Sequence, residues 1–231
     1  ARTKEPFLVP EMQYEGFGIV GRVTFPSGAL IDGERLDVYY GGADTVCCKA
    51  SIHLPHLMDA MQKDLESEYI TRYDGNPILT GIPEHAWESR LAFNPTAVDI
   101  DGVVHIVYRG MGADNTSVMG LATSKDGITI EERLPEPIYT PRKDFEMKHG
   151  SPMGNSGCED ARLTRMGDTI YMTYTAYQGV GNTRVALTTI SVSDFVAKRF
   201  DRWSEPVLIT PAGIDEKDVC IFPEKIQGKY V

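Results

Sequence analysis

The stretch Glu136-Pro137-Ile138-Tyr139-Thr140-Pro141 decides the fold, because related stretches recur along the chain. The other copies are Glu5-Pro6-Phe7-Leu8-Val9-Pro10, Asn76-Pro77-Ile78-Leu79-Thr80 and Glu205-Pro206-Val207-Leu208-Ile209-Thr210-Pro211. They are spaced by roughly 60–70 residues, and repeats of that length made of short strands and tight turns are typical of a radial or stacked array. The repeat therefore predicts the architecture and also the place where residues from different copies meet.

A second motif, a Gly or Asp turn followed by a strand that contains tyrosine, keeps step with the first. Its copies are Ile31-Asp32-Gly33 before Tyr39, Ile100-Asp101-Gly102 before Tyr108, and Met166-Gly167-Asp168 before Tyr174. A fourth copy, residues 226–231, is interrupted by the end of the chain. An apolar run precedes each turn, and a strand with alternating β-branched and aromatic residues follows it. A third strand and a short fourth strand complete each repeat. Four antiparallel strands per repeat predict an all-β fold of β-propeller blades.

One segment breaks this rhythm, because its apolar residues recur at helical spacing. Leu57, Met58, Met61 and Leu65 predict a helix over residues 54–69. We interpret this helix as a connector between propeller halves. The expected organisation is one blade over residues 1–53, a helical connector over 54–72, and further blades over 73–231 that stop inside a strand.

The composition favours a protein without nucleic-acid or membrane partners. The 231 residues carry a net charge of −10, which disfavours binding to polyanions and anionic lipids. No apolar run approaches the roughly 20 residues that span a bilayer, and no signal peptide opens the chain. The first residue is not Met, so we expect that processing or truncation removed the true start.

The cysteines and histidines show no spacing typical of a metal site. The four cysteines contain no CxxC pair and are interpreted as reduced thiols of a cytoplasmic protein. We therefore expect no metal.

Polar residues collect where the innermost strands begin. Overlaying the repeats places Phe25, Asn94 and Asp160 in register, and in a propeller these strand starts surround one mouth of the central channel. The other candidates for this mouth are Asp44, Arg109, Glu159, Arg162, Thr175 and Glu224. Carboxylates in a concave site suit glycosidic bond cleavage, in which one acid protonates the leaving oxygen. The arginines could alternatively hold a phosphate.

The stretch Gly157-Cys158-Glu159-Asp160-Ala161-Arg162 resembles the Glu-Asp-Pro-Arg signature of glycoside hydrolase family 130, the β-mannoside phosphorylases with a five-bladed propeller. The similarity extends through almost the whole chain. It includes the motifs Phe93-Asn94-Pro95, Tyr108-Arg109, Gly120-Leu121-Ala122-Thr123-Ser124, Tyr171-Met172-Thr173-Tyr174 and Phe222-Pro223-Glu224-Lys225-Ile226.

Two departures from the family pattern stand out. Ala161 replaces the usual proline, and Tyr39-Tyr40-Gly41-Gly42-Ala43-Asp44-Thr45, which resembles the family's C-terminal motif, comes first. This order suggests a piece spanning two tandem modules or, alternatively, a circular permutation. The blade with the family's His-Gly phosphate motif has no counterpart here. We therefore expect open blade edges that favour self-association, and little activity without the absent segment.

The resemblance implies inverting phosphorolysis of β-mannosides that releases mannose 1-phosphate, with Asp160 as the general acid. It implies substrate contacts by Asn94, Arg109, Glu159, Arg162 and Asp44, and phosphate contacts by Arg109, Lys225 and Arg184. Inorganic phosphate is the co-substrate, and no other cofactor is expected. A β-mannosidase with Glu159 or Glu224 as the base is the first alternative. An inactive glycan-binding module is the second.

Overall fold

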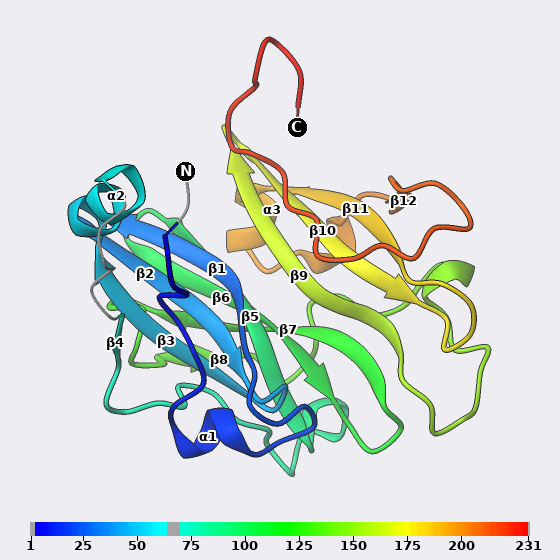
Figure 1. Cartoon of the computed structure of the whole chain (residues 1–231). Coiled ribbons are helices and arrows are strands. Elements are labelled where there is room, and N and C mark those ends of the chain that lie inside the picture. The colour runs from blue at the N-terminus through cyan, green and yellow to red at the C-terminus, as the bar shows by residue number, and fades with distance from the viewer. Residues whose placement is uncertain (1–2, 64–69, 231) are drawn as a thin grey trace.

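The computed structural model describes residues 3–63 and 70–230, and its strands form three four-stranded antiparallel units (Figure 1). Unit 1 contains β1 (Thr24–Asp32), β2 (Arg35–Gly42), β3 (Val46–His53) and β4 (Thr71–Arg72). Unit 2 contains β5 (Leu91–Ile100), β6 (Val103–Met111), β7 (Thr116–Ser124) and β8 (Glu132–Arg133). Unit 3 contains β9 (Ser156–Met166), β10 (Thr169–Tyr177), β11 (Arg184–Ser191) and β12 (Val207–Leu208). The all-β prediction is confirmed.

The first strands of the three units lie together at the centre of the molecule. β1, β5 and β9 contact one another, and each begins the meander of its own unit. Units 2 and 3 are also joined by a short parallel pairing, in which Thr116 and Ser117 of β7 face Ser156 and Gly157 of β9. Residues from three distant parts of the sequence therefore meet where these first strands begin.

The repeated proline-containing motif supplies the outer edge of each unit, as the sequence predicts. Leu79 bridges to Cys47 of β3, and Tyr139 bridges to Met119 of β7. In unit 3 the motif is long enough to form β12, which pairs with β11. Because proline cannot donate a ladder hydrogen bond, a short edge segment is the position where it is tolerated.

The helices are short and lie between the strands. They are α1 (Gln13–Gly16), α2 (Leu54–Lys63) and α3 (Val192–Val196), with single 3₁₀ turns η1 (Ala86–Glu88), η2 (Asp144–Glu146) and η3 (Phe200–Arg202). The predicted helix begins at Leu54 and is observed through Lys63, while its predicted remainder, 64–69, lies outside the described residues. The boundaries of the expected domains at 53 and 72 stay predictions. Among the helices that the structure describes, none has the length and apolar character needed to cross a membrane.

A buried glutamate fixes the short helix that precedes the main strands of each unit. Glu15, Glu88 and Glu146 are all fully buried. Each accepts a hydrogen bond from a tyrosine of the second strand of its unit; the donors are Tyr40 (2.8 Å), Tyr108 (2.9 Å) and Tyr174. The carboxylates are further satisfied by Arg72 on Glu15 (2.7 Å), Arg133 on Glu88 and the Tyr139 hydroxyl on Glu146 (3.0 Å). These contacts balance the cost of burying three charges.

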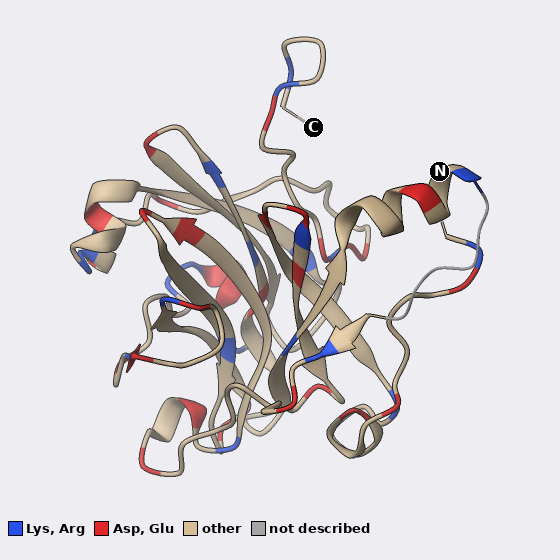
Figure 2. Cartoon of the chain, turned by 90° about the vertical axis from the view of Figure 1, so that its left-hand side faces the viewer, with Lys and Arg blue, Asp and Glu red and all other residues tan. Residues whose placement is uncertain are grey.

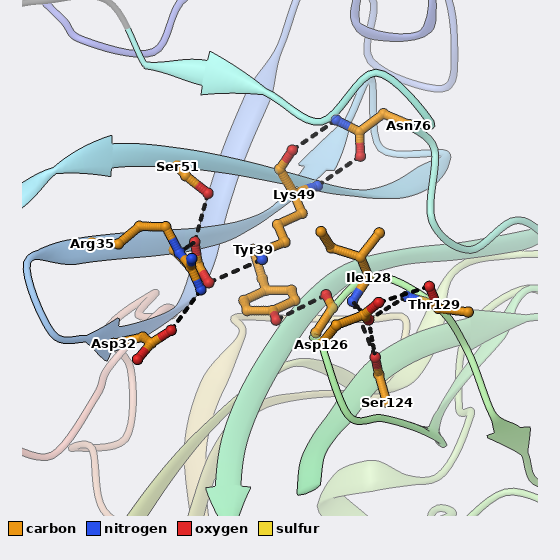
Figure 3. A network of polar contacts seen from close by, with 12 residues as sticks. Asp32, Arg35, Tyr39, Lys49, Ser51, Asn76, Ser124, Asp126, Ile128 and Thr129 are labelled. Carbon is orange, nitrogen blue, oxygen red and sulfur yellow. Dashed lines mark hydrogen bonds and ion pairs between the residues drawn. The ribbon is translucent and has the colours of Figure 1, made fainter. Parts of the chain in front are cut away.

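A polar network joins units 1 and 2 (Figure 3). It involves β2, β3 and the turn that follows β7. The buried Lys49 ammonium lies 2.9 Å from Asp37, which also binds Arg35 at 3.0 Å. The Tyr39 hydroxyl donates to the Gly127 carbonyl of the neighbouring unit at 3.0 Å. Basic and acidic positions elsewhere are spread over strands, turns and helices (Figure 2).

The tail after β12 is extended and lies beside unit 3. Thr164 of β9 donates to the Ile221 carbonyl at 2.9 Å, and Thr173 of β10 donates to the Val219 carbonyl at 2.5 Å. Over 219–226, where the sequence predicts the first strand of another blade, the described chain has only an isolated bridge between Ile226 and Lys229. Side-chain hydroxyls rather than a backbone ladder hold this segment.

Candidate active site

Asp160 and Asn94 lie at matching irregularities of two central strands. Both residues have left-handed backbone angles, with φ of 53° for Asp160 and 49° for Asn94. At each of them the register with the next strand shifts, as in a β-bulge. A bulge re-aims a side chain out of the regular alternation, and Asn and Asp adopt this conformation more readily than other non-glycine residues.

The corresponding irregularity of β1 lies one residue beyond the position predicted from the overlay. The register of β1 shifts between Pro26 and Gly28, and Pro26 pairs with Tyr40. The bulges at Asn94 and Asp160 lie opposite Tyr108 and Tyr174, the equivalents of Tyr40. Phe25 is therefore not the equivalent of Asn94 and Asp160. An overlay of turn glycines is displaced by one residue here, because Gly33 is the first and Gly102 the second residue of its two-residue turn.

Arg109 of β6 is the centre of the site. Its guanidinium lies 2.9 Å from Glu159 and 3.2 Å from Asp160, and its Nε donates to the Ser117 hydroxyl at 2.8 Å. Asn94 donates its amide hydrogen to the same Asp160 oxygen at 2.8 Å. Arg109 is 7% exposed and Asp160 is 8% exposed, so these contacts are made largely out of water. Hydrogen bonds between charged groups are strong under such conditions.

Three carboxyl groups, those of Glu159, Asp160 and Asp44, act on the buried guanidinium of Arg109. Burial raises the pKa of Glu159, although the charge of Arg109 opposes this. Burial and the neighbouring Asp160 also raise the pKa of Asp44, which belongs to the turn after β2. Burial alone would lower the pKa of Arg109, but the charges of Glu159 and Asp160 raise it. The site therefore retains its cation and favours a proton on one of its carboxyl groups.

These side chains line a cavity of about 390 Å³, a volume within the range of small-molecule sites. Its polar and charged lining consists of Asp44, Arg90, Arg109, Asn115, Asn155, Glu159, Asp160, Thr183 and Lys217. Apolar side chains, among them Ile19, Val20 and Phe93, line the remainder. A buried acid beside a cation, in a cavity with both polar and apolar walls, can protonate one part of a ligand while holding an anion nearby.

The structure brings some of the predicted site residues together and places others elsewhere. Asp44, Arg109, Glu159 and Asp160 share the cavity, and Asn94 contacts Asp160 from behind with 2% of its own surface exposed. Thr175 is also buried, on β10 opposite Glu159. Asn94 therefore contacts the proposed acid, and its contact with substrate stays a prediction.

Besides Asn94 and Thr175, four further predicted residues lie outside this cavity. Arg162 donates to the Pro26 carbonyl at 3.1 Å and lines a different cavity. Arg184 donates to the Thr210 carbonyl. Lys225 lies over the Tyr230 ring, 4.7 Å from its centroid, and Glu224 is exposed in the tail.

Lys217 is a cavity residue that the sequence interpretation missed. It lies in the tail, and it lines the cavity together with Arg109 and Glu159. The sequence contained one signal for it. The pair Lys217-Asp218 directly precedes residues 219–226, which the sequence predicts as the first strand of another blade. The pair was hidden because the tail reaches the site without forming a regular strand.

Comparisons with known proteins find similar sequences over most of the chain. A family model for glycoside hydrolase family 130, described as beta-1,4-mannooligosaccharide phosphorylase, matches residues 1–63 and 71–231. A 1,2-beta-oligomannan phosphorylase from Thermoanaerobacter sp. (strain X514) is 30% identical over 173 residues, which cover 70% of this chain and 52% of the relative. A Beta-1,2-mannobiose phosphorylase from Listeria innocua serovar 6a is 33% identical over 220 residues, covering 94% of this chain and 51% of the relative. The chain spans about half the length of these relatives.

Solved glycoside hydrolases share the fold. A thermostable family-43 glycoside hydrolase superimposes with a TM-score of 0.55 at 17% identity, covering 84% of this chain and 55% of the other. An alpha-L-arabinofuranosidase from Clostridium thermocellum gives 0.53 at 12% identity, covering 90% and 59%. At these identities the likeness concerns the arrangement of strands alone.

Proposed function

The chain belongs to glycoside hydrolase family 130, and on that premise we propose that it performs inverting phosphorolysis of β-mannosides within a five-bladed β-propeller. The observation that carries this proposal is the single cavity that holds Asp160, Arg109 and Lys217 together. The relatives named as phosphorylases of mannose-containing substrates support the choice of reaction. The buried free thiols of Cys47, Cys48 and Cys158 support a reducing compartment such as the cytoplasm.

In this reaction Asp160 acts as the general acid. A phosphate oxygen forms a bond to the anomeric carbon while the bond from that carbon to the leaving sugar oxygen breaks. The Asp160 proton passes to the leaving oxygen, directly or through a sugar hydroxyl, so that mannose 1-phosphate and the shortened sugar are released. The hydrogen bonds from Asn94 and Arg109 fix the orientation of the Asp160 carboxyl group.

Arg109 and Lys217 supply the positive charge for phosphate. Both line the cavity of Asp160, and a guanidinium can hold two phosphate oxygens at once. An incoming phosphate held by these cations would lie in the same cavity as the Asp160 carboxyl group, so the nucleophile and the proposed acid could act on one substrate.

Hydrolysis by a β-mannosidase is the second candidate function, and the position of Glu159 is the observation that favours it. Glu159 lies in the cavity with a raised pKa, as suits a general base for water. Its ion pair with Arg109 argues the other way, because it lowers the basicity of the carboxylate. Glu224, the other predicted base, is exposed outside the cavity.

The test is to incubate the full-length gene product that contains these 231 residues with β-1,2- and β-1,4-mannobiose, with and without inorganic phosphate. These 231 residues alone are expected to show little turnover, because they span about half the length of the relatives. We expect mannose 1-phosphate only when phosphate is present, and we expect Asp160→Asn to lose turnover by roughly a hundredfold or more while binding of the disaccharide persists. Equal cleavage without phosphate, abolished by Glu159→Gln, would instead establish hydrolysis. Binding without any turnover would leave a glycan-binding module.

The two lysines of the tail provide a matched test of the phosphate site. Lys217→Met should raise the KM for phosphate by roughly tenfold to a hundredfold, because it removes a cation from the cavity. Lys225→Met removes the same charge eight residues later, outside the cavity, and should leave this KM unchanged. The opposite outcome, with an effect at Lys225 and none at Lys217, would contradict this assignment.

A further inference from the structure

The loop of residues 17–21, between α1 and β1, forms an apolar wall of the active-site cavity. Ile19 and Val20 line this cavity together with Asp44, Arg109 and Asp160. Ile19 is 58% exposed and Val20 is 47% exposed, whereas the Asp160 side of the cavity is buried. The cavity thus combines a buried polar floor with a rim open to solvent, at which Ile19 and Val20 supply the apolar wall and Arg90, Asn155 and Lys217 supply polar groups.

This loop is held against the turn that carries Asp44. The Val20 amide donates to the Ala43 carbonyl at 3.2 Å, and the Ile19 amide donates to the Thr45 hydroxyl at 3.3 Å. At Gly18 a Cβ atom would come within 2.2 Å of the Ala43 oxygen, so only glycine allows this close approach. Ala43 and Thr45 flank Asp44, and the wall and Asp44 are therefore positioned as one body.

The two kinds of wall match the two kinds of surface on a pyranose ring. Hydroxyl groups at the edge of the ring suit the buried carboxylates and the guanidinium, which can accept and donate hydrogen bonds. The C–H face of the ring suits exposed aliphatic side chains, because covering them removes apolar surface from water. The ring that reacts must lie at Asp160, so the next ring of the substrate lies toward the open rim, where Ile19 and Val20 supply the exposed apolar surface.

We infer that Ile19 and Val20 form the binding surface for the leaving-group sugar, and thereby determine which acceptor the enzyme uses. This inference rests on the proposed function, since it assigns the second ring of the same β-mannoside. Phe17 belongs to the same loop and is 79% exposed, but it is not among the residues that line the cavity. It therefore offers an apolar control position on the same segment.

The kinetic test uses the reverse reaction, in which mannose 1-phosphate and an acceptor mannose combine. The double substitution Ile19→Ser with Val20→Ser should raise the KM for the acceptor about tenfold and leave the KM for mannose 1-phosphate unchanged. Phe17→Ser should change neither. An unchanged acceptor KM, or an equal rise in both constants, would overturn the inference while leaving phosphorolysis intact.

A binding test keeps the inference separate from the reaction type. In the Asp160→Asn background, calorimetry should show that the double substitution weakens binding of β-1,2- or β-1,4-mannobiose about tenfold and leaves binding of mannose unchanged. If the double substitution weakens disaccharide binding in this way but the unsubstituted protein shows no phosphorolysis, the proposed function is refuted and the assignment of Ile19 and Val20 is supported. Equal weakening for both sugars, no weakening for either, or no binding of either sugar by the parent protein would refute the wall.

Discussion

Arg109 is the residue on which both stability and chemistry of the site depend, since it faces Glu159 and Asp160 in a largely dry environment. Arg109→Met removes this charge and should further raise the already raised pKa of Glu159, because Arg109 acts to lower it. Breaking a buried ion pair in this way costs about 3–5 kcal/mol. Urea unfolding should report this loss.

The loss should depend on pH. A carboxyl group whose pKa is raised in the folded state binds more protons there than in the unfolded chain, so stability falls as pH rises from the ordinary pKa of glutamate through the raised value. Arg109→Met should therefore be more destabilised at about pH 7.5 than at about pH 5. Arg202→Met, which removes an exposed arginine, should stay within about 0.5 kcal/mol of the parent at both. A pH-independent difference would show that lost packing, not lost charge, dominates.

The sequence could identify this group of residues but not every member. Asn94, Glu159 and Asp160 follow from repeated strand starts, because such starts converge in any radial array. Arg109 follows from its place near the end of the second strand of its unit. Arg162 falls two residues beyond Asp160, where the strand has passed the bulge and directs its side chain to the Pro26 carbonyl. Lys217 enters from an extended tail, and no periodic pattern describes such a segment.

At the level of elements, the buried glutamates join each short helix to its unit. Glu88→Gln preserves the size of the side chain but leaves the Arg133 guanidinium without its carboxylate partner, and Arg133 lies over the Tyr108 ring. We expect a loss of about 3 kcal/mol in the free energy of unfolding. The control is Glu84→Gln, an exposed position four residues earlier, which should change stability by less than about 0.5 kcal/mol. Equal effects at both positions would contradict a structural role for this contact.

These glutamates had a signal in the sequence that the interpretation did not use. Tyr14-Glu15, Trp87-Glu88 and Phe145-Glu146 each place an acidic residue after an aromatic one, ahead of the first strand of a unit. An acidic residue in a turn is ordinarily solvated, so the pattern alone gives no reason to bury it. The partner tyrosines lie 20–28 residues away, and only the folded meander brings them near.

At the level of the whole molecule, the candidate site exists because three units share one centre. Asp44 comes from unit 1, Arg109 from unit 2 and Asp160 from unit 3, and all three line one cavity. Strand alternation and turn residues could predict the units. The packing of β1, β5 and β9 around a common centre depends on contacts between segments far apart in sequence, and the repeat predicted it because repeats of this kind form a radial or stacked array.

The most direct measurement is phosphorus and proton NMR of β-mannobiose incubated with the protein and inorganic phosphate, followed from the start of the reaction. Because a single displacement at the anomeric carbon inverts its configuration, α-mannose 1-phosphate should appear first, in amounts equal to the mannose released, and nothing should form without phosphate. Free mannose formed at the same rate in the absence of phosphate, or an initial β-phosphate product, would contradict inverting phosphorolysis at Asp160.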